Sequence, residues 1–256
     1  MKKKCIRCKN EFEASPMIGN DDVCRTCERM NCITFWYPRL QRLGFPMPKT
    51  EIIYTDIKLE ALLDGVKPEG IDEFINKIEE AIIKVGSPTF IRTGYLSNKH
   101  DWEKSCFLRK GITRGEIISH IANLVEMSSI ATIDRMTPID FWAVREFIET
   151  EPYFNYFPGK MPITKERRYF INDGKIQCHH NYWDRKAFGN DIDEKEFEKL
   201  ATLSEEDEKE LEKMASYIAN IFSGYWSVDF LKGKDGQYRM IDMAIGERSY
   251  HPSHDK

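Results

Sequence analysis

The stretch that decides the fold is Tyr225-Trp226-Ser227-Val228-Asp229-Phe230, which a Lys234-Asp235-Gly236 turn connects to Met240-Ile241-Asp242-Met243-Ala244. Two runs of this composition joined by a Lys-Asp-Gly turn predict a β-hairpin. Asp229 and Asp242 lie at the centres of its two arms, each between apolar neighbours. A carboxylate in such a position is costly to bury unless it is paired or holds a cation.

These two acids allow two interpretations. Carboxylates from paired strands can meet on one face of a sheet, and oxygen ligands of that kind suit Mg²⁺ bound together with nucleotide phosphates. Alternatively, each acid could form an ion pair with a nearby arginine such as Arg239 or Arg248. The pattern of the hairpin alone favours neither interpretation.

Composition limits the class of protein. The chain has 256 residues, 41% hydrophobic and 31% charged, which is enough for one large domain or a medium domain with an appendage. Its net charge of −4 provides no global basic field for nucleic acid. Eleven acids and four bases lie between Asp191 and Lys213, so the rest of the chain is net basic. We expect this acidic run to be a solvated helix and its approach.

The sequence has no pattern of a membrane or secreted protein. No apolar run is long enough to cross a bilayer. The Met-Lys-Lys-Lys start is followed by Cys5 and charged residues, where a signal peptide would have an apolar stretch. We therefore expect a soluble, cytoplasmic protein without a membrane partner.

Four of the seven cysteines have the spacing of metal ligands. Cys5-x-x-Cys8 and Cys24-x-x-Cys27 each offer two thiolates from one tight turn, and two such turns complete a tetrahedral Zn²⁺ site. A redox pair or a disulfide framework is the alternative. The segment is too short and polar to bury a core, so the metal would replace one. Its role would be structural, because four thiolates leave no open coordination position. The remaining cysteines are expected to be small buried hydrophobes: Cys32, Cys106 and Cys178.

Apolar periodicity, turn residues and capping signals predict the other elements. Ser204-Glu205-Glu206-Asp207 is a capping box that opens a helix. Helices are expected over residues 36–43, 71–85, 116–126 and 205–222, and strands over 51–54, 89–93, 141–148, 168–171 and 175–178. Helices and strands alternate irregularly with several hairpins, which indicates an α+β or mixed α/β fold.

Basic residues stand on several of these strands. Arg92 ends one strand, Arg145 lies inside the apolar run Val144–Ile148, and Lys165 and Arg168 flank another strand. Cations at sheet edges are commonly solvated. Together with the two hairpin acids, however, these residues would supply cations for a polyphosphate and acids for Mg²⁺.

This constellation resembles the ATP-grasp superfamily, in particular the ATP-grasp domain proteins of phages and bacteria. The resemblance covers roughly residues 36–252 and leaves the cysteine module outside. It rests on motifs that follow one another in order: Phe90-Ile91-Arg92-Thr93 with Ser97-x-Lys99-His100-x-Trp102, Val144-Arg145-Glu146-Phe147-Ile148, Met161-Pro162-Ile163 with Glu166-Arg167-Arg168-Tyr169-Phe170, Cys178-His179-His180 with Tyr182-Trp183, Trp226-Ser227-Val228-Asp229-Phe230, and Ile241-Asp242-Met243-Ala244-x-Gly246-Glu247 with Ser249-x-His251-Pro252.

The resemblance implies an α+β fold of two lobes that clasp ATP, preceded by a small α/β segment. The expected division is a zinc-ribbon-like module at 1–32, a small segment at 33–88 and the ATP-grasp domain at 89–256. It implies an ATP-dependent ligase that joins a carboxylate to an amine through an acyl phosphate. The alternative is a non-catalytic ATP-binding factor similar to the ATP-grasp chaperones that help assemble translation initiation factors. The zinc module could contact nucleic acid or protein.

The resemblance also implies residue roles. Arg168 and Lys99 are expected to be catalytic, with Arg168 at the γ-phosphate or the acyl phosphate. Phosphoryl transfer needs charge neutralisation and alignment, which cations supply. The expected ATP-binding set is Arg92, Lys99, Arg145, Glu146, Phe147, Ile148, Lys165 and Arg168, with residues 146–148 as the adenine-side hinge. The expected Mg²⁺ ligands are Asp229, Asp242 and Glu247.

Two features depart from the family's pattern. Many ATP-grasp ligases have Asn two positions after the second metal-binding acid, whereas Ala244 stands there in this chain. Glu247 is near enough in sequence to substitute. No glycine-rich lid is evident, and the loop over residues 97–102 could serve instead. His179 and His180 could handle a proton during amine attack, although a buried, hydrogen-bonded histidine is the commoner outcome.

Overall fold

The computed structural model describes residues 2–14, 22–135, 138–189 and 191–252, without the side chains of 131–135. Contacts within the chain divide it into two compact units, each of which contains one four-stranded sheet. Unit 1 comprises Met1–Leu43, Pro48–Phe147 and Phe157–Met161, and unit 2 comprises Gly44–Met47, Ile148–Tyr156 and Pro162–Lys256. The division at 1–32, 33–88 and 89–256 stays a prediction.

Unit 1 begins with the cysteine module. Strands β1 (Lys2–Lys4) and β2 (Glu11–Glu13) form a small antiparallel hairpin. Helix α1 (Arg25–Glu28), the 3-10 turn η1 (Arg29–Asn31) and helix α2 (Ile33–Arg42) follow. The backbone N–H of Ile33 donates to the carbonyl of Gly94, 2.9 Å away, so the start of α2 is held against the loop after β4.

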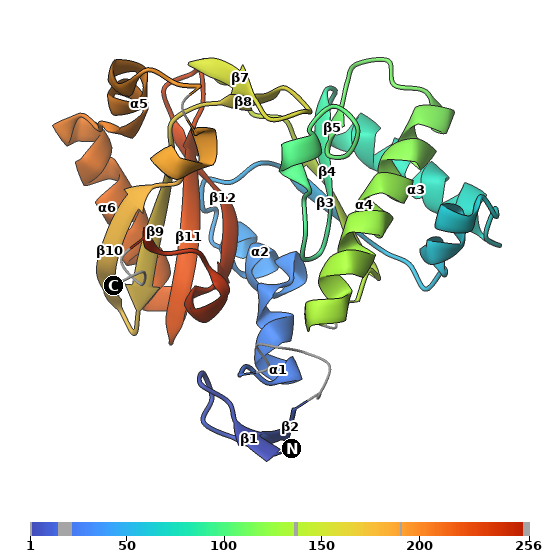
Figure 1. The fold of residues 1–256 in the computed structure, drawn as a ribbon, viewed down its shortest axis with the longest axis horizontal. Helices are drawn as coiled ribbons and strands as arrows, with labels where there is room; N and C mark the ends of the chain where they lie inside the picture. Colours follow the sequence, from blue (N-terminus) through green and yellow to red (C-terminus); the bar gives the residue numbers. More distant parts are fainter. Residues whose placement is uncertain (1, 15–21, 136–137, 190, 253–256) are drawn as a thin grey trace. The chain divides into compact units, whose positions relative to one another are not determined.

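The sheet of unit 1 is entirely antiparallel. Its order is β3-β6-β4-β5, and two long helices and two 3-10 turns connect the strands (Figure 1). The strands are β3 (Thr50–Tyr54), β4 (Thr89–Thr93), β5 (Phe107–Leu108) and β6 (Phe141–Glu146). The helices are α3 (Ile71–Val85) and α4 (Arg114–Arg135), and the 3-10 turns are η2 (Leu59–Asp64) and η3 (Lys99–Asp101).

The core of unit 1 lies between α3, α4 and one face of this sheet. Alternate residues of β4 and β6 enter it, as the two-residue period of a strand requires. The core includes Phe74, Ile75 and Ile78 of α3, Ile117, Ile121 and Leu124 of α4, and Ile91, Trp142 and Val144 of the sheet. The residues between them on β4 and β6, including Arg92 and Arg145, belong to the opposite face.

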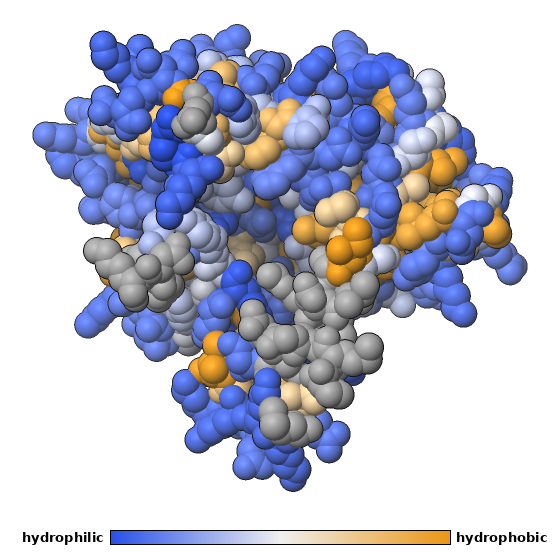
Figure 2. Space-filling model, viewed as in Figure 1, coloured by the Kyte–Doolittle hydropathy of each residue, from blue (hydrophilic) through white to orange (hydrophobic). Residues whose placement is uncertain are grey.

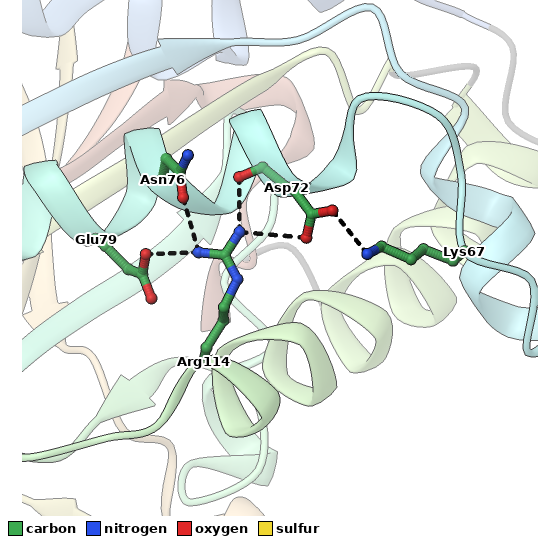
Figure 3. A network of polar contacts seen from close by, with 5 residues as sticks. All are labelled: Lys67, Asp72, Asn76, Glu79 and Arg114. Carbon is green, nitrogen blue, oxygen red and sulfur yellow. Dashed lines mark hydrogen bonds and ion pairs between the residues drawn. The ribbon is translucent and has the colours of Figure 1, made fainter.

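An exposed ionic network joins the beginnings of α3 and α4 (Figure 3). The guanidinium of Arg114 lies 2.6 Å from Glu79 and 2.8 Å from the side-chain oxygen of Asn76. It also donates to the backbone carbonyl of Asp72, whose carboxylate is 2.7 Å from Lys67. Ion pairs as exposed as these add little to the stability of a fold, because solvent screens their charges. Their main effect is to fix how the two helices meet.

Unit 2 contains the second antiparallel sheet, in the order β10-β9-β11-β12. Its strands are β9 (Glu166–Asn172), β10 (Lys175–Asn181), β11 (Tyr225–Lys232) and β12 (Tyr238–Ile245). The short strands β7 (Phe154–Tyr156) and β8 (Met161–Ile163) form a separate pair. The remaining elements are α5 (Glu194–Ala201), α6 (Glu205–Ile221), η4 (Arg185–Phe188) and η5 (Gly246–Arg248).

Helix α6 covers one face of this sheet. The predicted hairpin is confirmed, because β11 pairs with β12 and Asp229 lies directly opposite Asp242. Trp226, Val228 and Phe230 are fully buried, and Trp226 packs edge-on against Phe222 at the end of α6. The intervening residues of β11, Ser227 and Asp229, therefore belong to the other face. We call this second surface the polar face of unit 2.

The face drawn in Figure 2 is largely hydrophilic, with some areas of apolar side chains. The exposed apolar residues of unit 1 include Ile83 of α3, 81% exposed, and Ile130 of α4, 56% exposed. Among the residues that the structure describes, no helix is both long enough and apolar enough to span a bilayer.

Candidate functional site

The polar face of unit 2 carries a row of four side chains, one from each strand. His180 of β10 lies opposite Arg168 of β9, Arg168 lies opposite Asp229 of β11, and Asp229 lies opposite Asp242 of β12. Residues directly opposite each other in an antiparallel ladder project to the same face. Two acids, a guanidinium and an imidazole are therefore gathered on one surface. We call these four residues the cross-strand row.

Arg168 and Asp229 form a two-pronged ion pair at the centre of this row. The Nε of Arg168 donates to one carboxylate oxygen of Asp229 and an Nη to the other, both at 2.7 Å. The ring of Tyr182 lies 4.6 Å from the guanidinium carbon, a cation–π contact. Burial by itself would lower the pKa of Arg168. The attraction of Asp229 and its hydrogen bonds together outweigh burial, so the pKa is raised above the ordinary value of an arginine. The guanidinium is permanently charged here.

The sequence allowed an arginine partner for each hairpin acid, and the structure provides one for Asp229. The partner is Arg168, which was expected to bind phosphate, whereas Arg239 pairs with Asp235 in the hairpin turn at 2.5 Å. The two interpretations of Asp229 therefore involve the same residues. Ion pairing with Arg168 satisfies this buried carboxylate within the protein, and a phosphate would be an alternative partner for Arg168.

Asp242 is the more accessible of the two acids. Asp229 is 5% exposed, whereas Asp242 is half-buried, and one of its oxygens accepts a hydrogen bond from the N–H of Met243 at 3.0 Å. Glu247, the third expected Mg²⁺ ligand, lies in η5 just after β12. Within the described residues, the three carboxylates do not form a compact ligand cluster like that of the cysteines. The structure brings Asp229 and Asp242 together and leaves Glu247 as a nearby acid.

Unit 1 places two other expected cofactor residues on the face of its sheet that α3 and α4 leave uncovered. Arg92 and Arg145 are each 4% exposed. The Nε of Arg145 donates to the hydroxyl of Thr50, its cross-strand neighbour, at 3.1 Å, and the Nε of Arg92 donates to the carbonyl of Thr93 at 3.1 Å. Each sheet of the protein thus has one face packed against helices and one face that carries arginines.

The remaining expected ATP-binding residues lie in several places. Lys99 lies in η3 next to His100. Burial is the main cause that lowers the pKa of His100, and the positive charge of Lys99 lowers it further. Glu146 accepts a hydrogen bond from the N–H of Lys49 at 3.0 Å, and Phe147 packs against Phe107. Phe147 ends one segment of unit 1 and Ile148 begins one segment of unit 2, so the expected adenine-side residues are divided between the two units. Lys165 is not part of the cross-strand row, and its charge acts on Asp207 instead.

The two adjacent histidines belong to different surfaces. His179 lies opposite Tyr169, stacks on its ring, and is 3.5 Å from Glu208 of α6. His180 lies on the polar face, where burial lowers its pKa and Arg168 and His251 act in the same direction. His180 is therefore neutral near pH 7, and only His180 shares a surface with the two acids.

Three contacts on this face involve residues that stand in the sequence motifs but were given no role at the site. Tyr182 contacts Arg168, Ser227 shares a hydrogen bond of 2.5 Å with Ser249, and Cys178 lies 2.9 Å from His251. The alternation of β10 could have placed Cys178 beside His180, since the two are separated by one residue. The approach of His251 could not be predicted, because it depends on the path of the chain after β12.

The four paired cysteines form the second candidate site. Their sulfur atoms all lie within 4.8 Å of one another, and those of Cys8 and Cys24 are 3.6 Å apart. A tetrahedron with Zn–S bonds of about 2.3 Å has edges of about 3.8 Å. All four thiols are free, which excludes a disulfide framework in this structure. The donor set and its spacing fit a structural zinc ion.

Backbone hydrogen bonds prepare one of these thiols for metal binding. Burial raises the pKa of Cys5, but N–H groups of Cys24, Cys8 and Arg7 outweigh it and bring the pKa down to about 7. The N–H of Cys24 is 3.3 Å from this sulfur. Burial raises the pKa of Cys24 and of Cys27. A dication would offset that cost for the whole group, because zinc binds thiolates.

Comparisons with known proteins bear on the fold. No protein-family model matches the sequence, and no curated protein matches it. By structure, the chain is similar to C-terminally truncated Cdc123 from Schizosaccharomyces pombe, with a TM-score of 0.59, 15% identity, and coverage of 87% of this chain and 86% of that one. These values establish likeness of fold alone.

Two further solved structures are more distant. A RimK domain ATP-grasp protein from Sphaerobacter thermophilus has a TM-score of 0.48 and 11% identity over 91% of this chain and 64% of its own. N5-carboxyaminoimidazole ribonucleotide synthetase from Thermotoga maritima has a TM-score of 0.46 and 11% identity over 86% of this chain and 42% of its own. The chain thus spans less than two thirds of either protein.

The expected fold class is confirmed. The chain has an α+β structure with the ATP-grasp fold, and a cysteine cluster lies near its N-terminus.

Proposed function

We propose that this chain binds ATP with Mg²⁺ and is a ligase that joins a carboxylate to an amine, or a similar nucleophile, through an acyl phosphate. The cross-strand row on the polar face of unit 2 is the observation that carries this proposal. It combines Arg168, a permanent cation suited to phosphate, with Asp229 and Asp242, oxygen donors suited to Mg²⁺. An ATP-grasp fold with these groups on one surface has the parts that phosphoryl transfer requires.

We assign the proposed roles from the charge and the exposure of each side chain. Asp242, the more accessible acid, would hold Mg²⁺ together with Asp229, and Glu247 would complete the set from η5. Arg168 would neutralise charge on the transferred phosphoryl group, with Lys99 as the second catalytic cation. Arg92, Arg145 and Lys165 would bind phosphates, and residues 146–148 would contact the adenine. When bound, Mg²⁺ supplies charge neutralisation and alignment of the phosphates.

The second candidate function is a non-catalytic ATP-binding assembly factor. It retains the same nucleotide site and differs only in turnover. Ala244, which stands where many ATP-grasp ligases have a metal-binding Asn, favours this candidate because it removes one oxygen ligand. Under either function, we propose that the zinc module is structural and contacts protein or nucleic acid. The cytoplasmic location and the similarity to phage and bacterial ATP-grasp proteins also stay predictions.

Replacing Asp242 with Asn tests the nucleotide site. Because Mg²⁺ uses few protein ligands and keeps several waters, the loss of one carboxylate is expected to weaken Mg-ATP binding strongly. We expect Asp242→Asn to melt at the temperature of the unchanged protein without ligand and to lose the stabilisation that Mg-ATP gives. Thermal melts with and without Mg-ATP measure both quantities.

Asp235→Asn is the matched control, because Asp235 belongs to the same hairpin but pairs with Arg239 in the turn. It should keep the full Mg-ATP effect. An Asp242→Asn protein that melts much lower yet is still stabilised normally by Mg-ATP would show that this acid is structural.

Turnover separates the two candidate functions. Hydroxylamine is a small nucleophile that captures acyl phosphates as hydroxamates, so it replaces the unknown amine. With a panel of carboxylates, a ligase releases ADP and forms hydroxamate in equal amounts, and Asp242→Asn forms neither. Stabilisation by Mg-ATP without ADP release from any carboxylate–amine pair would favour the assembly factor.

A further inference from the structure

The segment after η5 crosses the polar face of unit 2 and ends beside β10 (Figure 1). Three consecutive residues anchor it to three different parts of the unit. Ser249 shares a hydrogen bond of 2.5 Å with Ser227 of β11, and the hydroxyl of Tyr250 donates to the carboxylate of Asp184. The ring of His251 packs on Phe170 of β9, with centroids 4.4 Å apart. These contacts fix where the imidazole of His251 lies.

That imidazole meets a thiol. The Sγ of Cys178 is 2.9 Å from the Nε2 of His251, and Cys178 lies on β10 directly opposite Phe170. Cys178 is half-buried, and burial raises the pKa of its thiol. The sulfur is therefore protonated at rest and can donate its proton to Nε2. A nucleophile within hydrogen-bond reach of a positioned base is the arrangement that covalent catalysis uses.

This pair adjoins the cross-strand row. Cys178 and His180 are two residues apart on β10 and share the polar face, and the rings of His180 and His251 are 5.7 Å apart. His180 in turn lies opposite Arg168. Within the described residues, the buried Nε2 of His180 has no hydrogen-bond partner. The polar face that carries the thiol and the guanidinium thus also carries a buried ring nitrogen without a hydrogen-bond partner.

We propose that Cys178 accepts the acyl group as a thioester, with His251 as its base, so that the ligase reaction passes through an acyl-enzyme. This inference rests on the proposed ligase function and adds a covalent step to it. Arg168 would hold the phosphate of the acyl phosphate, and Cys178 would receive the acyl carbon. The substrate class is an acyl phosphate whose acyl group extends along the polar face toward β10.

The chemistry balances in two steps. In the first, Sγ of Cys178 attacks the carbonyl carbon, a C–S bond forms, and the bond from that carbon to the phosphate oxygen breaks. The thiol proton passes through Nε2 of His251 to the departing phosphate. In the second, the amine attacks the thioester, an amide forms, and the C–S bond breaks. A proton from the amine returns through His251 to the sulfur, which restores the thiol.

Acetyl phosphate, a small acyl phosphate, tests this without ATP or the natural substrate. Zinc-loaded full-length protein is incubated with it at fixed pH, and acetylation is located by peptide mass spectrometry. We expect a thioester at Cys178 that neutral hydroxylamine removes, formed at least tenfold faster than at Cys32 or Cys106. Lysine acetylation, an amide, resists hydroxylamine and is thereby distinguished.

Single-residue variants test the role of Cys178 as nucleophile and of His251 as its base. General base catalysis contributes about 10²–10⁴-fold, so His251→Ala should slow acetylation of Cys178 by about a hundredfold or more. Added imidazole should restore part of the rate, which a purely structural role of His251 would not allow. Cys178→Ser should form no thioester. His179→Asn is the matched control, because His179 lies on the other face of the same strand, and it should acetylate normally.

Failure of this inference is distinguishable from failure of the ligase proposal. Cys178 that reacts no faster than Cys32 and Cys106 in a protein that Mg-ATP still stabilises would overturn the acyl-enzyme and leave the nucleotide site intact. Equal rates in His251→Ala and the unchanged protein, with both folded by thermal melt, would also overturn it. Rapid, imidazole-dependent acetylation of Cys178 would support it even if no carboxylate substrate were found.

Discussion

At the scale of single residues, the Arg168–Asp229 contact is a nearly buried ion pair. Its side chains are 14% and 7% exposed, so two charges are held almost out of water by two hydrogen bonds of 2.7 Å. Such a pair contributes little net stability compared with apolar residues of the same volume, but the loss of one partner strands the other charge.

A double-mutant cycle measures the cost of leaving one charge without its partner. We expect Asp229→Leu and Arg168→Leu each to lower the free energy of unfolding by about 3–5 kcal/mol, because each leaves a buried charge without its partner. The double variant should lose much less than the sum. Urea denaturation of the four proteins provides the coupling energy. Single losses below about 1 kcal/mol, or additive losses, would mean that water already solvates this pair.

The sequence places Asp229 on a hairpin strand but does not predict its ion-pair partner, Arg168. The hairpin itself follows from local information, because the Lys-Asp-Gly turn connects its two strands. That Asp229 faces Asp242 does not, because the register set by the turn pairs Phe230 with Met240 and a bulge then shifts the ladder by one residue before Asp229. The Asp229–Arg168 contact joins residues 61 positions apart. Its register depends on how β9 and β11 pack over α6, which no local pattern encodes. The partner proposed from proximity in sequence, Arg239, is bound instead by Asp235.

At the scale of elements, helix starts are well determined by their own residues. Ser204 caps α6 as expected, because its hydroxyl accepts from the N–H of Asp207 at 3.1 Å. Helix α4 was expected to begin at 116, but a second capping box starts it at Arg114. In that box, Thr113 donates from its N–H and its hydroxyl to Glu116, both at 2.7 Å, and Glu116 N–H reaches back to Thr113 at 3.4 Å.

This second capping box predicts that the start of α4 loses stability as the pH falls. The hydrogen bonds from Thr113, followed by Arg109, lower the pKa of Glu116 from 4.5 to about 2. A lowered carboxyl pKa means that its contribution to stability is present above about pH 4.5 and is lost as the pH falls toward about 2. We expect an NMR titration to show Glu116 with a midpoint near the lower value, and Thr113→Ala to raise that midpoint.

Ser119→Ala is the control for this titration. Ser119 lies on the same helix and its hydroxyl bonds the carbonyl of Gly115, not Glu116. Its replacement should leave the midpoint unchanged. A Glu116 midpoint near 4.5 in the unchanged protein would mean that the box is open in solution.

Element length decides what could be predicted at this scale. Helix α3 and strand β4 have the expected bounds, since apolar residues at helical spacing and a terminating Gly86-Ser87-Pro88 define them. Strand β5 has two residues and strands β7 and β8 three each, too short to carry a period. Strand β5 forms because β4 offers it hydrogen-bonding groups, whereas β7 and β8 pair only with each other.

At the scale of the whole molecule, the cysteine module and the cross-strand row belong to different units. The four clustered cysteines lie before residue 28 in unit 1, and the row lies in unit 2. Cys32, the last residue of the expected module, is buried, and a side chain at Gly94 would meet its sulfur at 2.6 Å. The junction to the rest of unit 1 therefore depends on residues outside the metal cluster.

We expect loss of zinc to leave nucleotide binding unchanged. Cys5→Ser removes one thiolate from the cluster, so the protein should no longer bind the proposed zinc ion, as measured by elemental analysis. The first thirty or so residues should become sensitive to protease. The Mg-ATP shift in melting temperature should remain. Cys106→Ala, which changes a buried cysteine outside the cluster, should retain zinc. A tenfold loss of ATP affinity in Cys5→Ser would show that the two sites are coupled.

Under the proposed function, the ion pair between Arg168 and Asp229 would couple the binding of phosphate to the binding of the metal ion. A phosphate that takes Arg168 alone would leave Asp229 uncompensated, and a metal ion that takes Asp229 alone would leave Arg168 uncompensated. Each ligand would therefore raise the affinity for the other. This coupling is positive heterotropic linkage, and it is reciprocal by thermodynamic necessity. The protein should therefore bind the Mg-ATP complex more tightly than it binds free ATP or free Mg²⁺.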